Sequence, residues 1–220
     1  MDNRDIENGQ GHHHIELHDP ANVRSNRFAA SAVLRIASAG LQLWGGYTGG
    51  ESALIVEAGE EFTDGITFAA ASVEARTEKK GLTQKARNIA IGFAMGAATI
   101  ATGVTGAELL AERNAAFKPL EGIDLHNNEY KAAVGALALN SIVFFLNRNG
   151  NKSDKVSDKF AYKDSLRDAV IPATVLGLAA VKAPQYFKSI FEIGGVSYGW
   201  YNTVQLYKGW RGKAQKHEAK

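Results

Sequence analysis

The 220-residue chain contains no cysteine, only 4 prolines and only 2 methionines. The absence of cysteine excludes disulfides, thiolate metal ligands and cysteine nucleophiles. Any metal site must therefore be built from oxygen and imidazole ligands. The net charge is only +2, so no strong overall field indicates a nucleic-acid partner.

Residues 1–26 lack the apolar run of a secretory signal peptide and contain mainly polar and charged side chains. We expect them to form a polar cytoplasmic arm. His12, His13, His14 and His18 make this arm rich in imidazole, a common metal ligand. They are candidate accessory metal ligands, and a disordered polar arm without metal explains them equally well.

Six weakly polar stretches follow, most of them close to the roughly 20 residues needed to cross a bilayer. They cover residues 28–47, 52–73, 89–110, 132–146, 160–181 and 190–207. None alternates strictly between polar and apolar residues, and their alanine content is typical of helices. The mean hydropathy of -0.19 favours a soluble protein when taken alone. We nevertheless predict an all-α, six-helix transmembrane bundle over residues 27–208, followed by a basic tail over 209–220.

The main support for this prediction is the uneven distribution of basic residues between alternate connections. Most of the 25 lysines and arginines lie in the arm, the second and fourth connections and the tail. The other connections hold only Arg113, Lys118, Lys131, Lys182 and Lys188. Positive residues gather on the cytoplasmic side of membrane proteins, whereas a soluble bundle has no reason to sort them. We expect an integral, multi-pass protein of the cell (inner) membrane, with both termini in the cytoplasm.

Four acidic residues interrupt the second stretch: Glu57, Glu60, Glu61 and Asp64. A carboxylate at the bilayer centre costs about 2.5–3.5 kcal/mol, so four in one span need compensation. Residues three and four apart lie on one face of a helix, so Glu60 and Asp64 can present two carboxylates to one ion. In the alternative interpretation, these acids line the solvated face of a soluble helix and pair with arginines or lysines.

Asp164 and Asp168 repeat the four-residue spacing in the fifth stretch. If the two helices face each other, Glu60, Asp64, Asp164 and Asp168 form a site of four carboxylates. Close carboxylates repel one another, so the empty site should take up protons and release them when metal binds. A proton-driven metal exchanger requires this coupling.

These segments resemble the cation diffusion facilitator (cation efflux) family of metal transporters. The family's second span reads roughly D-A-x-H-S-x-x-D, and the run E-A-G-E-E-F-T-D from Glu57 to Asp64 follows it. The family's fifth span carries a second ligand pair, which the run from Asp164 to Asp168 matches. The run G-A-L-A-L-N that ends at Asn140 is similar to the fourth span, which commonly carries an asparagine.

This resemblance covers nearly the whole chain and implies a homodimeric transporter without a resident cofactor. The implied metal ligands are Glu60, Asp64, Asp164 and Asp168, with Glu57, Glu61 and Asn140 beside them or along the ion's path. The chain departs from the family because carboxylates replace its histidine ligands, and we expect no C-terminal cytoplasmic domain. Arg35 and Arg167 are also unusual within spans, and an inward Arg167 would neutralise Asp164 or Asp168.

A site made only of carboxylates favours manganese or iron(II), with zinc, cobalt or cadmium behind them. We predict a transporter that exports such a cation from the cytoplasm by proton antiport. The chain lacks a nucleophile elbow, a Walker loop, a dinucleotide fingerprint and a zinc-protease motif, so we do not expect an enzyme. Two alternatives stay open: a transport-inactive membrane partner subunit of the same fold, and a soluble helical interaction protein.

Overall fold

The computed structural model describes residues 21–49, 52–77, 80–112, 120, 122–124 and 126–218. These residues form six long helices and one short 3-10 helix, which confirms the all-α prediction. The helices are α1 (Ala21–Gly49), α2 (Ser52–Arg76), α3 (Lys80–Glu112), α4 (Asn128–Asn147), η1 (Arg148–Lys152), α5 (Val156–Ala180) and α6 (Gln185–Glu218). The four histidines of the N-terminal arm lie outside the described residues.

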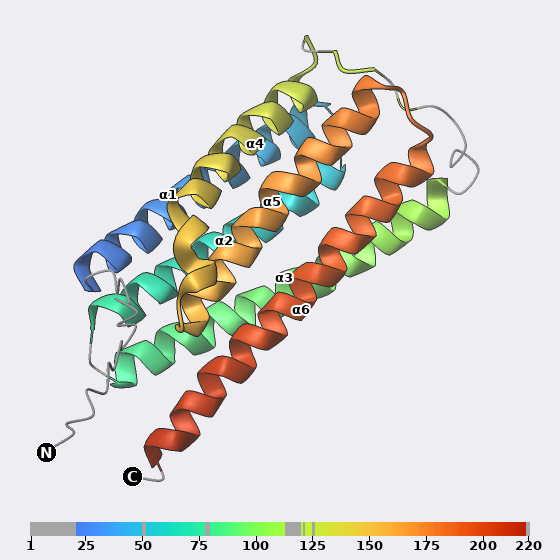
Figure 1. Ribbon diagram of the computed structural model, residues 1–220. Coiled ribbons are helices and arrows are strands. Elements are labelled where there is room, and N and C mark those ends of the chain that lie inside the picture. The colour runs from blue at the N-terminus through green and yellow to red at the C-terminus, as the bar shows by residue number, and fades with distance from the viewer. Residues whose placement is uncertain are drawn as a thin grey trace, which may run out of the picture.

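Consecutive helices run in opposite directions along an elongated bundle (Figure 1). α1 packs along α2 and α4, and α5 packs between α4 and α6. α3 contacts α2 and α6, which completes the bundle. Because the directions alternate, α1, α3 and α5 begin at the end where α2, α4 and α6 finish. The basic connections predicted to lie on one side of a membrane therefore gather at one end of the molecule.

Asp158, in the first turn of α5, holds this basic end together. Its Oδ1 accepts hydrogen bonds from Arg24 Nε (3.0 Å) and Arg27 Nη2 (2.8 Å) of α1, and Oδ2 accepts from Ser153 Oγ (2.7 Å). A carboxylate in the first turn of a helix also complements the helix dipole. A Cβ atom at Gly150 would collide with the Asp158 carbonyl oxygen, so η1 can pack here only because residue 150 is glycine.

The apolar core is small and rich in alanine. Phe28 of α1 and Phe68 of α2 pack with their ring centroids 6.2 Å apart, and their cluster otherwise contains Val143 and four alanines. A second cluster joins α2, α3, α5 and α6 around Phe160 and Leu206. Alanine lets helix backbones approach closely, so little apolar volume is needed to fill these contacts.

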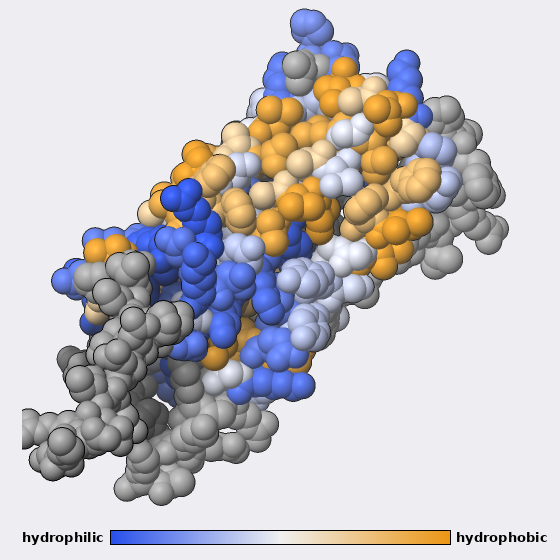
Figure 2. Space-filling model, in the orientation of Figure 1, coloured by the Kyte–Doolittle hydropathy of each residue, from blue (hydrophilic) through white to orange (hydrophobic). Residues whose placement is uncertain are grey.

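The distribution of polarity is inverted along α1. Its buried face carries Arg24, Ser25, Ser31, Arg35, Ser38 and Gln42. Its exposed face carries large apolar side chains, with Val33 67 % exposed and Leu43 53 % exposed. Figure 2 shows hydrophobic residues over the half of the visible face that lies away from the basic end. α1 thus buries many polar side chains and exposes large apolar ones.

Six membrane spans were predicted, but within the described ranges only one helix, Tyr130–Lys152, is long and apolar enough to cross a membrane. This segment comprises most of α4 together with η1. α1, α2 and α5 carry buried charged residues, among them Arg35, Glu61 and Asp164, and these lower the average hydropathy of the three helices. Length and composition therefore identify a single candidate span in an all-helical fold.

Candidate ion-binding site

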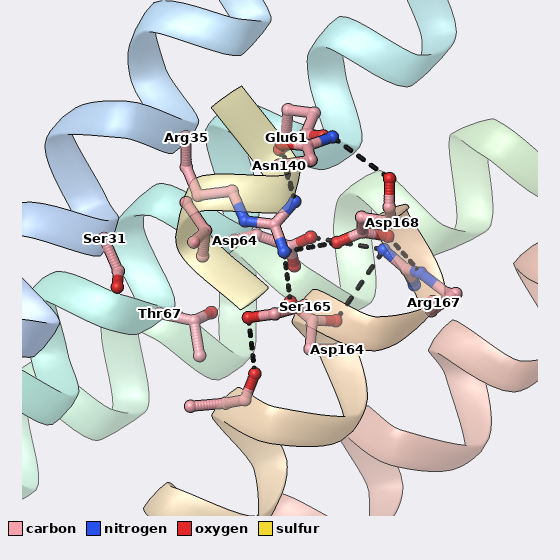
Figure 3. A network of polar contacts seen from close by, with 12 residues as sticks. Ser31, Arg35, Glu61, Asp64, Thr67, Asn140, Asp164, Ser165, Arg167 and Asp168 are labelled. Carbon is pink, nitrogen blue, oxygen red and sulfur yellow. Dashed lines mark hydrogen bonds and ion pairs between the residues drawn. The ribbon is translucent and has the colours of Figure 1, made fainter. Parts of the chain in front are cut away.

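The guanidinium of Arg35 occupies the centre of the bundle between α1, α2, α4 and α5 (Figure 3). Arg35 is 0 % exposed. Its Nη1 lies 2.7 Å from Glu61 Oε2, and its Nη2 lies 2.5 Å from Asp168 Oδ2 and 3.4 Å from Asp164 Oδ2. One arginine thus links carboxylates of two helices, α2 and α5. A buried guanidinium needs such partners, because an unpaired buried charge is strongly destabilising.

Arg167 of α5 approaches the same acids from the other side (Figure 3). Its Nη2 lies 3.2 Å from Asp64 Oδ2 and 3.7 Å from Asp164 Oδ1, and its Nε donates to Asp168 Oδ1. A Cβ atom at position 199 would collide with Arg167 Nη1, so Gly199 of α6 provides the space for this side chain. The inward orientation considered for Arg167 is the one that the structure adopts.

Asn140 of α4 connects the ion pairs to a break in the backbone hydrogen bonding of α5. Pro172 has no N–H, so it cannot donate to the carbonyl of Asp168 one turn earlier. Asn140 Nδ2 donates to that carbonyl at 3.3 Å and also donates to Glu61 Oε1, while Asn140 Oδ1 accepts from Arg35 Nη1 at 3.3 Å. The asparagine therefore satisfies a helix carbonyl and a carboxylate with one side chain.

Three of the carboxylates have the proximity of metal ligands. Glu61, Asp64 and Asp168 each place one oxygen within 4.8 Å of the others. Glu61 and Asp168 are buried and Asp64 is half-buried. Ligand oxygens of hard divalent cations lie about 2.0–2.6 Å from the ion, so one cation can bind oxygens at this spacing.

The charges of the network do not balance. Glu61, Asp64, Asp164 and Asp168 face the two guanidiniums of Arg35 and Arg167, which leaves an excess of two negative charges when all four acids are ionised. Glu60, which is half-buried on α2, adds its charge close to Arg167. Buried excess charge must be neutralised by protons or by a cation.

The structure brings together most of the residues predicted from the sequence. Asp64, Asp164, Asp168 and Asn140 all belong to the network. Glu61, predicted to lie beside the ligands or along the path, belongs to the group with metal-ligand spacing. The predicted ligands Glu60 and Asp164 do not. The other residue predicted for the path, Glu57, is half-buried one turn from Glu61.

The central role of Arg35 was not predicted from the sequence. A regular spacing could have revealed it, because positions 24, 28, 31, 35, 38 and 42 follow one another at intervals of four and three residues. That spacing marks one face of a helix, and every position except Phe28 is polar. A polar stripe within an otherwise apolar helix indicates an interior polar network.

Comparison of the chain with protein-family models, with curated proteins and with solved structures finds no match.

Removal of the Arg35 charge should destabilise the bundle. We expect Arg35→Met to cost about 3–5 kcal/mol, because it leaves buried carboxylates without their main partner. Addition of Glu61→Gln should recover part of this loss, since it removes one unpaired charge. Thermal unfolding of the purified variants measures both effects. Arg76→Met, at an exposed position of α2, should stay within about 0.5 kcal/mol of the wild type. Equal melting of the Arg35 and Arg76 variants would contradict the role given to Arg35.

The contact between Asn140 and the Asp168 carbonyl predicts an interaction between two substitutions. Asn140→Leu should destabilise the protein less in a Pro172→Ala background, because alanine supplies the N–H that the carbonyl lacks. The difference should be about 1 kcal/mol, the net contribution of one hydrogen bond. A double-mutant cycle of unfolding free energies tests this. The matched cycle with Ser141→Ala, at the next position of α4, should be additive, and additivity in both cycles would exclude the compensation.

Proposed function

We propose that this protein is an integral membrane protein that binds a divalent cation at Glu61, Asp64 and Asp168 and transports it in exchange for protons. The observation that carries the proposal is the buried network of four acids and two arginines. When Glu60 is left out, the excess of two negative charges among these four acids equals the charge of one divalent cation or of two protons. Metal and protons would thus compete for the same neutralising role.

The inverted polarity of the helices supports a membrane location. In a soluble bundle, the exposed faces carry the charged residues and the interior is apolar. Here Arg35, Asp164 and Asp168 are buried while large side chains such as Val33 and Phe145 are exposed. Ionisable residues within membrane segments face the bundle interior and pair with one another. The one-sided distribution of basic residues supports cytoplasmic termini for the same protein.

The chemistry of the donors favours a hard cation. Carboxylate oxygens suit manganese and magnesium, whereas zinc sites more often contain imidazole or thiolate. Manganese or iron(II) is therefore the proposed cargo, with zinc, cobalt or cadmium behind them. The resemblance to the cation diffusion facilitator family and the expected homodimer stay predictions within this proposal.

A specific observation favours a second candidate, a transport-inactive subunit of the same fold. Both side-chain oxygens of Glu61 and of Asp168 already face a guanidinium or amide nitrogen. A cation that binds there must displace Arg35 or Arg167 from at least one oxygen. If a cation cannot displace either arginine, the network is a permanent set of ion pairs. The protein would then be a transport-inactive subunit that associates with another protein.

The membrane location predicts the fractionation of the full-length chain. The protein should sediment with membranes, stay there after an alkaline carbonate wash and be released by detergent. Recovery in the soluble fraction without detergent would overturn the membrane part of the proposal and favour a soluble interaction protein.

If the protein binds a cation at this site, only substitutions of the site's carboxylates should lower the affinity for the metal. In calorimetric titration of the purified protein with manganese, Asp64→Asn should weaken binding by at least about 10-fold, because it removes the charge of one ligand. Glu74→Gln makes the matching change on the same helix, at a carboxylate paired with Arg87, and should bind as the wild type does.

The accompanying transport assay uses proteoliposomes with a pH gradient and follows both internal manganese and internal pH. We expect manganese movement coupled to opposite proton movement, and we expect both to fall together in Asp64→Asn. Absence of manganese binding by the wild type, combined with binding by Arg35→Gln, would reject transport in favour of the inactive-subunit candidate.

A further inference from the structure

Two buried polar side chains continue the face of α1 beyond Arg35. Ser38 is 0 % exposed and Gln42 is 1 % exposed. Within the part of the chain that the structure describes, neither Ser38 Oγ nor Gln42 Oε1 has a hydrogen-bond partner. An unpaired buried polar group is destabilising, and such groups in folded proteins usually bind ordered water.

Two contacts locate these side chains between α2 and α4. Arg35 meets Glu61 and Asn140 at one level of the bundle. Toward the far end of α1, a Cβ atom at Gly45 would meet Ala132 of α4 and Leu54 of α2. These contacts fix how α2 and α4 run past α1.

Between the two levels, the described residues of α2 and α4 that are fully buried are Ala58 and Ala136. Ser38 and Gln42 lie on α1 at this height. Methyl groups cannot accept or donate a hydrogen bond. Water is the partner that these two polar groups require.

We propose that Ser38 and Gln42 line a file of buried water that joins the Arg35 network to the end of the bundle where α1 finishes. Glu57, half-buried on α2 one turn from Glu61 toward this end, places a carboxylate near its outer part. Toward the basic end, the same face of α1 carries Phe28, which packs on Phe68.

This inference rests on the proposed function for what moves along the path, namely protons or a hydrated cation. The hydration itself follows from the unpartnered atoms. Alternating access requires the site to be connected to one side of the membrane at a time, and a path toward the end where α1 finishes would connect it to that side.

Thiol labelling tests this proposal. Because the chain has no cysteine, the only thiol in a single-cysteine variant is the introduced one. The variants are Ser38→Cys, Gln42→Cys and Ala39→Cys, in the full-length protein reconstituted in vesicles. Ala39 is the matched control, since it lies next to Ser38 at the same depth and is also buried (6 % exposed). Each variant is treated with a small charged methanethiosulfonate, which reacts with thiolates in contact with water.

We expect the cysteines at positions 38 and 42 to react at least about 10-fold faster than the cysteine at position 39, because only hydrated thiols ionise readily. All three should react equally after unfolding in detergent at high temperature. Rates at both positions no faster than at position 39 would overturn the proposal. Gln42→Cys keeps the test valid if Ser38→Cys does not fold.

A second measurement separates this inference from the proposed function. Gln42→Leu should leave the affinity for manganese unchanged and lower the rate of manganese transport in proteoliposomes. Fast labelling without any transport by the wild type would keep the water path and reject the proposed function. Transport by the wild type with slow labelling at both positions would reject the path and keep the proposed function.

Discussion

The buried guanidinium of Arg35 is the constraint on which the rest of the structure depends. A charge that is 0 % exposed must be surrounded by partners, and these come from α2, α4 and α5. The contacts hold four helices at fixed heights relative to one another. The apolar core is too small to do this alone, since most of its members are alanines without distinctive shape. The ion pairs therefore specify how the helices fit together, and the alanines let them come close enough to do so.

The missing backbone hydrogen bond at Pro172 of α5 is also part of this network. Pro172 would leave the Asp168 carbonyl without a donor in an isolated helix. In the folded protein Asn140 supplies that donor and holds Glu61 with the same amide group. The helix irregularity, the asparagine and the two acids thus form one unit, in which each group satisfies another that burial would otherwise leave unpaired. A proline at this position is tolerated because α4 provides the missing hydrogen bond.

The sequence predicts the helices well, because segment length and alanine content are local signals. It also predicts that Asp64, Asp164 and Asp168 come together, because a four-residue spacing places both acids of a pair on one helix face. It did not predict that Glu61 would take the position assigned to Glu60. Adjacent residues lie about 100° apart around a helix, and only the packing of α2 against α1 decides which of them faces inward. The partners of Arg35 depend likewise on contacts between helices far apart in sequence.

The excess negative charge of the network and the polar face of α1 are two parts of the same proposal. Carboxylates that outnumber their arginines need a mobile positive charge, and such a charge needs a hydrated route to a buried place. Ser38 and Gln42 would provide that route at the point where the ion pairs end. If the proposed function holds, Arg35, which contacts Glu61 and Asp168, would compete with that charge for both acids. Because the guanidinium of Arg35 is covalently attached to α1, a bound cation could displace it from the carboxylates but could not remove it from the protein. Its contacts with the acids would therefore be made when the site is empty and loosened when it is filled, which couples occupancy of the site to the position of α1.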